Sequence, residues 1–216
     1  MLMRKAREEL VEYGLRMYRD GLVTMTSGNI SIYNPATGTM AITPSGIPYD
    51  LMKVEDIVIM TLDGEILEGT CKPSSEHSLH AAAYRVRPEA RAVVHTHSKY
   101  ATVMSTLGES VKAVQFVFAN ILNCSEIPVA PYRTYGTEAL AEVVSEALKN
   151  SPACLMANHG MVASGTTLEN AYMAATIVES TAEIQWRAEC VGKPSCLTEA
   201  EVHETYEAFT KTYGQK

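Results

Sequence analysis

Apolar residues recur at helical spacing in several segments of the chain. In the first of these segments, Ala6, Leu10, Tyr13 and Met17 lie on one face, and Gly21 is a natural stop. The same spacing predicts further helices over residues 73–85, 98–107, 137–148, 167–189 and 198–212. Thr137 is placed to cap the fourth helix, and Thr198 with Glu201 forms a capping box at the start of the last one.

Shorter apolar runs between these helices predict strands. Four of these runs are predicted to form two hairpins, 30–33 with 40–43 and 57–62 with 65–67. The second hairpin has Asp63-Gly64 at its turn. Single strands are expected at 92–96, 111–118 and 154–157. Hairpins mixed with helices predict one α/β domain over residues 1–216. Its central sheet should be mostly antiparallel or mixed and flanked by helices, without the strict alternation of a doubly wound fold.

Composition narrows the classes of function. The formal net charge of −7 argues against a nucleic-acid-binding protein, which would usually show a basic face. No apolar run approaches the roughly 20 residues of a membrane span, and the charged first 20 residues have no signal-peptide core. The five cysteines include no C-x-x-C pair, as is typical of reduced thiols. We therefore expect a cytoplasmic protein that contacts neither nucleic acid nor membrane.

Three histidines stand at the ends of apolar strands. His95 and His97 are two residues apart, so their side chains should point to the same face of a strand. His159 follows the run 155–157 and precedes a glycine. A histidine near a strand end is most often an ordinary hydrogen-bonding residue, but three in this pattern favour a zinc site with an open position. His77 and His80 are interpreted as surface residues, or as residues that support the site from behind.

Glu76 allows two interpretations. It follows Pro73-Ser74-Ser75 at the expected start of a helix, where the helix dipole favours a carboxylate. Glu76 is therefore either a capping residue or a general base beside the metal.

Small polar and glycine-rich corners form a third feature. Their hydroxyl and backbone N–H groups can cradle a phosphate, although each corner alone is an ordinary turn. The residues are Thr26, Ser27, Gly28 and Asn29, then Ser45 and Gly46, then Ser74 and Ser75.

These motifs together resemble the class II aldolase/adducin-head family, and within it most closely the L-fuculose-1-phosphate aldolases. The matching strings follow the family's order over nearly the whole chain. They are Thr-Ser-Gly-Asn-Ile-Ser (26–31), Ile-Thr-Pro-Ser-Gly-Ile-Pro-Tyr (42–49), Lys-Pro-Ser-Ser-Glu (72–76), Arg-Pro-x-Ala-x-Ala-Val-Val-His-Thr-His (87–97), Ala-Pro-Tyr-x-Thr-Tyr-Gly-Thr (130–137) and Asn-His-Gly (158–160).

The resemblance implies roles for individual residues. His95, His97 and His159 match zinc ligands, and Glu76 matches a catalytic acid/base that can also approach the metal. Three imidazoles would also accept Mn²⁺ or Co²⁺. The positions that match the phosphate site are Asn29, Ser45, Gly46, Ser74 and Ser75, with Thr26 and Gly28 in the same loop. Tyr213 matches a tail tyrosine that helps to close the site. The family is typically a homotetramer with its sites between subunits.

One position departs from the family. Phe116 stands where the aldolases place a tyrosine that handles the proton on the aldehyde oxygen, and a phenyl ring cannot transfer a proton. The stretch 120–126 also differs from the family and is one residue longer. Tyr135 stands where these aldolases have a phenylalanine that lines the same site. We hypothesise that Tyr135 takes over the acid role.

The activity implied is zinc-dependent cleavage of a phosphorylated ketose such as L-fuculose 1-phosphate to dihydroxyacetone phosphate and an aldehyde. Zinc would act as a Lewis acid, and Glu76 would handle the proton of the dihydroxyacetone half. A 5-deoxyribulose-1-phosphate aldolase is an alternative, as is a related pentulose-phosphate 4-epimerase, dehydratase or decarboxylase. A non-catalytic module like the adducin head is the alternative from another class.

Overall fold

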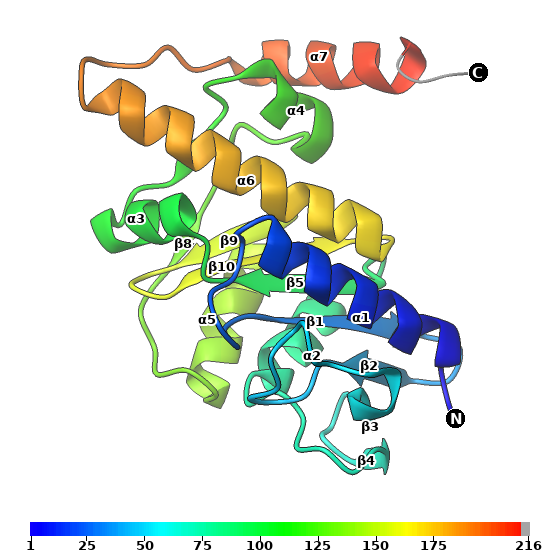
Figure 1. Cartoon of the computed structure of the whole chain (residues 1–216). Helices are drawn as coiled ribbons and strands as arrows, with labels where there is room; N and C mark the ends of the chain where they lie inside the picture. The colour runs from blue at the N-terminus through cyan, green and yellow to red at the C-terminus, as the bar shows by residue number, and fades with distance from the viewer. Residues whose placement is uncertain (213–216) are drawn as a thin grey trace.

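An eight-stranded sheet runs through the molecule, and helices pack on both of its faces (Figure 1). The computed structural model describes residues 1–212. The strand order is β4-β3-β2-β1-β5-β10-β9-β8, and a separate hairpin pairs β6 with β7. Only the pair β8–β9 of the large sheet is parallel among the described residues, so the expected mostly antiparallel α/β fold is confirmed.

The elements follow one another closely along the chain. The strands are β1 Asn29–Asn34, β2 Thr39–Ile42, β3 Val58–Thr61, β4 Ile66–Glu68, β5 Ala92–Thr96, β6 Val111–Lys112, β7 Glu126–Ile127, β8 Val129–Ala130, β9 Ala153–Met156 and β10 Gly160–Gly165. The helices are α1 Arg4–Arg19, the short 3₁₀ helix η1 Val54–Asp56, α2 His77–Val86, α3 Lys99–Leu107, α4 Phe116–Leu122, α5 Glu138–Leu148, α6 Leu168–Glu189 and α7 Glu199–Thr212.

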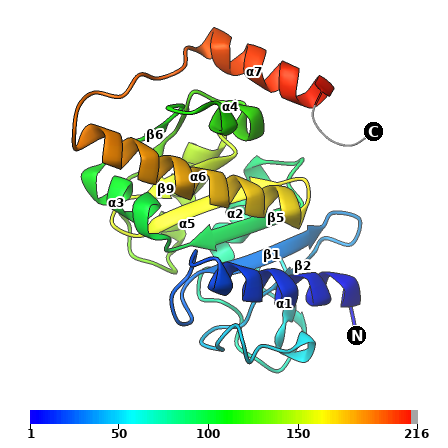
Figure 2. The ribbon, with the colours of Figure 1, turned by 45° about the horizontal axis from the view of Figure 1, so that its top comes forward.

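Alternation along the strands divides the core into two layers. On β5, Val94 packs in the layer under α1, α3 and α6, while Val93 packs in the layer under α2 and α5. The long helix α6 crosses β5 and β10 (Figure 1). Helix α4 lies against both α6 and α7, and a long connection after α6 leads to α7 (Figure 2). Within residues 1–212 no helix is long and apolar enough to cross a bilayer.

The capping motifs form as the sequence predicts. The Thr137 hydroxyl accepts a hydrogen bond from the Leu140 N–H at 3.3 Å, at the start of α5. At α7, the Glu201 N–H donates to the Thr198 hydroxyl at 3.3 Å, and the Thr198 N–H donates back to the Glu201 carboxylate at 2.7 Å. These bonds satisfy N–H groups that a helix start otherwise leaves without partners.

The prediction of a strand over residues 111–118 is wrong. The strand β6 covers two residues of that run, and α4 begins at Phe116. Phe118, Ala119 and Leu122 are buried at helical spacing, so the packing of α4 overrides the β propensity of the local sequence. The strand β10 was not predicted, because its sequence begins and ends with glycine and carries few strand-forming residues.

Gly160 gives a test of how tightly β10 packs on β5. A Cβ atom at this position would lie 2.3 Å from the backbone oxygen of Thr96. We expect Gly160→Ala to lower the free energy of unfolding by about 1–3 kcal/mol, because backbone atoms would have to shift. Denaturant unfolding measures the effect. Gly192→Ala is the matched control, since nothing lies within 4 Å of a Cβ there. Equal stability of the two variants would contradict the close approach.

Candidate active site

The end of β5 places two histidines at the centre of the sheet. This strand lies between β1 and β10, and its residue His95 is fully buried. His97 follows directly after the strand, and its Nε2 lies 2.9 Å from the Nε2 of His95. The alternation of side chains along a strand therefore brings both imidazoles to one point, as the sequence predicts.

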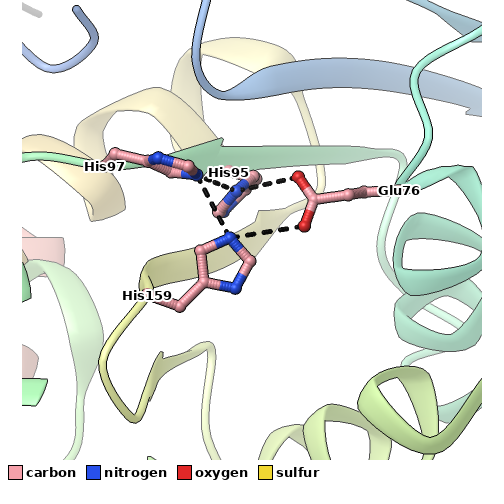
Figure 3. A group of neighbouring side chains, drawn as sticks. All are labelled: Glu76, His95, His97 and His159. Carbon is pink, nitrogen blue, oxygen red and sulfur yellow. Dashed lines mark hydrogen bonds and ion pairs between the residues drawn. The ribbon is translucent and has the colours of Figure 1, made fainter. Parts of the chain in front are cut away.

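A tight turn between β9 and β10 supplies the third histidine. The His159 N–H donates to the Met156 carbonyl at 3.0 Å, and Asn158 adopts a positive φ of 58° that asparagine tolerates. The turn directs His159 back over the sheet, so that its Nε2 lies 3.2 Å from the Nε2 of His97 (Figure 3).

Glu76 completes the cluster from the opposite side. It is the N-cap residue of α2, yet within residues 1–212 its side chain makes no capping hydrogen bond. Instead the carboxylate faces the histidines (Figure 3), with Oε2 3.1 Å from His95 Nε2 and Oε1 3.4 Å from His159 Nε2. Asn29 holds the same Oε2 by donating from Nδ2 at 3.0 Å. Of the two interpretations of Glu76, the geometry supports the one beside the histidines.

The donor set fits a divalent metal ion. One ligand atom from each of Glu76, His95, His97 and His159 lies within 4.8 Å of the others. The His95 Nδ1–H donates to the Met161 carbonyl at 2.8 Å, which turns Nε2 toward the cluster, where it can bind a metal ion that displaces its proton. Buried Glu76 Oε1 has no hydrogen-bond partner among the described residues, an arrangement that a bound cation would satisfy.

Charges within the cluster control its protonation. Burial acts to raise the pKa of Glu76, but the charge of His95 and the hydrogen bonds from His95 and Asn29 outweigh it and hold that pKa well below its usual range. Burial, and then the charge of His95, lowers the pKa of His97 to about 3 and that of His159 to about 4. Both imidazoles are therefore neutral near pH 7, with lone pairs available to a metal.

A cavity of about 390 Å³ opens above this cluster. Glu76, His97 and His159 line its floor, while His95 is buried beneath. Its walls include all eight residues of the polar corners, namely Thr26, Ser27, Gly28, Asn29, Ser45, Gly46, Ser74 and Ser75. Three corners that are distant in sequence thus meet around one cavity.

Backbone contacts hold these corners together. The Ser45 N–H donates to the Lys72 carbonyl at 2.9 Å, and the Ser74 N–H donates to the Thr43 carbonyl at 3.1 Å. The Tyr49 hydroxyl donates to the Gly28 carbonyl at 2.8 Å and so fixes the first corner. Gly28 adopts a φ of 75°, and a Cβ there would lie 2.7 Å from the His95 carbonyl, so glycine is required.

The remaining candidates occupy different places. Tyr135 lines the cavity wall and is 67% exposed. Phe116 is 62% exposed on α4 and does not line this cavity. Tyr213 lies outside the described residues. Tyr132 and Arg133 also line the cavity and were missed, although they belong to the motif at 130–137.

Of the two interpretations of His80, the structure supports a residue behind the site and not one on the surface. His80 is fully buried, and its ring contacts Asn29. The sequence does carry a signal for this position. His80 and Tyr84 are four residues apart on one helix, and polar Asn29 and Ser31 alternate on β1, so the two pairs could be expected to face each other.

Comparison with known proteins agrees with this geometry. The sequence profile of the Class II Aldolase and Adducin N-terminal domain family matches residues 8–186. The chain belongs to this family. It is 41% identical over 216 residues to the 5-deoxy-D-ribulose 1-phosphate aldolase of Bacillus thuringiensis, covering 100% of both chains. It is 39% identical over 212 residues to the L-fuculose phosphate aldolase of Escherichia coli, covering 97% of this chain and 96% of the other.

A solved structure extends the agreement to the fold. An L-fuculose 1-phosphate aldolase superposes with a TM-score of 0.91 at 36% identity, covering 95% of this chain and 96% of that one. The resemblance noted in the sequence is therefore confirmed, and the chain is a class II aldolase, an enzyme of the lyase class. The family and the Glu76 cluster together indicate a divalent metal site in this aldolase.

The metal site can be tested by thermal unfolding. We expect Zn²⁺, Mn²⁺ or Co²⁺ to raise the melting temperature of chelator-treated aldolase, because an ion present at 100 times its Kd stabilises the folded state by about 2.7 kcal/mol. The variant His97→Ala should lose most of this shift, whereas His203→Ala, at an exposed histidine of α7, should keep it. A full shift in the His97 variant would exclude His97 as a ligand.

Proposed function

We propose that this aldolase cleaves the C3–C4 bond of 5-deoxyribulose 1-phosphate, giving dihydroxyacetone phosphate and acetaldehyde, with L-fuculose 1-phosphate as the second candidate. The observation that carries the proposal is the cluster of Glu76 and three histidines on the floor of a cavity walled by the polar corners. The shorter substrate is favoured because the 41% identity to a 5-deoxy-D-ribulose 1-phosphate aldolase extends over all of both chains.

We propose zinc as the metal, held by His95, His97 and His159, with Glu76 as a further ligand when substrate is absent. Three imidazoles and one carboxylate are a set that zinc commonly takes. When bound, the ion supplies Lewis-acid polarisation of the substrate oxygens.

The phosphate is assigned to the polar corners. Their eight residues offer hydroxyl and backbone N–H groups, and Ser74 and Ser75 stand just before the N-terminus of α2, where the helix dipole favours an anion. Arg133 adds a cation to the cavity wall. Binding at the phosphate end would orient the three carbons of the dihydroxyacetone half over the floor.

Glu76 is the acid/base of the proposal. Its Oε2 is held by Asn29, whereas its Oε1 has no hydrogen-bond partner among the described residues and is free to carry a proton to or from C3. Its lowered pKa keeps the carboxylate ionised, as a base must be in the direction of synthesis. Positioned proton transfer of this kind contributes about 10²–10⁴-fold to a rate.

Tyr135 is proposed to exchange the proton of the C4 oxygen. Its exposed side chain on the cavity wall supports this proposal. The closing role of Tyr213 remains a proposal that rests on the resemblance.

We also propose a homotetramer with sites between subunits. The exposed side chain of Phe116 lies on α4, outside the cavity of its own chain. Phe116 would therefore reach the active site of a neighbouring subunit. A monomeric mass in sedimentation equilibrium would contradict this arrangement.

Turnover of the two ketose phosphates tests the function directly. We expect zinc-loaded enzyme to release dihydroxyacetone phosphate from 5-deoxyribulose 1-phosphate faster than from L-fuculose 1-phosphate, in a coupled assay. Chelator should abolish the release. Glu76→Gln should reduce kcat by about 10²-fold or more, because a carboxamide cannot transfer the proton.

The control is Glu142→Gln, at an exposed carboxylate of α5. Release from neither substrate by metal-loaded enzyme would refute the proposed reaction, and epimerase, dehydratase and decarboxylase assays would follow. A faster reaction with L-fuculose 1-phosphate would overturn the choice of aldehyde.

The role of Tyr135 has its own test. We expect Tyr135→Phe to lower kcat by about 10²-fold, because the phenyl ring fills the same space but cannot transfer a proton. Tyr132→Phe is the matched control, since Tyr132 is a second exposed tyrosine on the same wall. Unchanged turnover in the Tyr135 variant would refute the assignment.

A further inference from the structure

Behind Glu76, on the side away from the cavity, a chain of buried polar side chains links β1 to α2. Asn29 and Ser31 project from one face of β1, and His80 and Tyr84 project from one face of α2. The His80 ring lies between Asn29 Oδ1, at its Nε2, and Ser31 Oγ, 2.7 Å from its Nδ1. Ser31 Oγ in turn lies 2.7 Å from the Tyr84 hydroxyl. None of these side chains is more than 5% exposed, and His80 is fully buried.

The chemistry of the groups fixes the direction of every bond. The Glu76 carboxylate accepts, so Asn29 must present its NH₂ group to Oε2 and its amide oxygen to His80. An amide oxygen also accepts, so His80 must donate from Nε2–H. A neutral imidazole carries one N–H, which makes Nδ1 the acceptor of the Ser31 hydroxyl. Ser31 then accepts from Tyr84. Each proton points along the chain toward Glu76.

We propose that His80 is a positioning residue of the aldolase reaction, which acts by fixing the orientation of the Asn29 amide. With Oδ1 held by His80, one Asn29 N–H holds Glu76 Oε2 and the other is left for the cavity that Asn29 lines. The proposal rests on the proposed function, because the anions that these two N–H groups serve are the acid/base and the substrate phosphate.

The consequence for Glu76 is that its two oxygens are made unequal. Asn29 holds Oε2, while Oε1, without a hydrogen-bond partner among the described residues, remains free for proton transfer. If the amide turned over, its oxygen would face the carboxylate and two acceptors would repel each other. The His80 N–H opposes that rotation, since only an oxygen can accept from it. A space-filling apolar residue at position 80 would leave the amide oxygen without this donor.

The first test is made on the wild-type enzyme and does not depend on turnover. In the wild-type enzyme, a long-range ¹H–¹⁵N spectrum of ¹⁵N-labelled histidine should show the His80 ring protonated at Nε2 and unprotonated at Nδ1. Loss of signals in His80→Gln assigns them. Protonation of His80 at Nδ1 would overturn the proposal, whether or not either ketose phosphate is cleaved.

The second test is kinetic, with the ketose phosphate that the wild-type enzyme cleaves. His80→Leu should lower kcat per metal-loaded subunit by about 10–100-fold, as loss of a supporting hydrogen bond behind a metal site usually does. His80→Gln should recover most of this loss, because its amide can donate to Asn29 and accept from Ser31. In an Asn29→Ala background, His80→Leu should cost no further kcat, since its effect passes through Asn29.

His77→Gln is the matched control, because this second histidine of α2 lies beside Gly64 rather than in the chain. A folded His80→Leu enzyme with wild-type kcat would refute the proposal. So would equal losses in His80→Leu and His80→Gln, or full additivity with Asn29→Ala, which would indicate a purely structural role. Absence of wild-type turnover would count against the proposed reaction, and the histidine spectrum would still decide the role of His80.

Discussion

Repulsion among buried donors is the constraint on which the site depends. The His97 Nε2 lies 2.9 Å from that of His95 and 3.2 Å from that of His159, with the Glu76 carboxylate 3.1 Å from His95 Nε2. Lone pairs held this close in a low-dielectric environment repel one another, and a proton or a metal ion among them relieves that repulsion. The rest of the fold keeps these side chains from moving apart, because His95 is buried in the central strand and His159 stands on a tight turn.

The sheet explains why the cluster forms where it does. Asn29 of β1 stands opposite His95 of β5, and Met161 of β10 accepts from the His95 ring on the other side. Each neighbour of β5 therefore contributes one bond that orients either a ligand or the carboxylate. The site lies at the end of a central strand, where the surrounding backbone N–H and C=O groups are already paired in the sheet. The site is therefore held by the rigid core of the protein.

Much of this arrangement was predictable from local sequence. The spacing of His95 and His97, the Asn-His-Gly turn and the polar corners each carry a signal within a few residues, and these predictions agree with the observed geometry. Elements whose secondary structure depends on tertiary packing were harder to predict from the sequence. The sequence of α4 predicts a strand, but this segment packs against α6 and α7 as a helix. The segment of β10 forms a strand because β5 and β9 pair with it. The role of His80 also depends on how α2 packs against β1, which the i, i+4 spacing of His80 and Tyr84 does not specify by itself.

The floor and the walls of the cavity come from different parts of the chain. The histidines belong to the sheet and its tight turn, whereas Tyr132, Arg133 and Tyr135 belong to the loop between β8 and α5. Exposed loops tolerate changes of sequence and length that a packed sheet does not. The metal site and the loop above it can therefore change independently in evolution, because substitutions in the loop leave the ligands on the sheet in place.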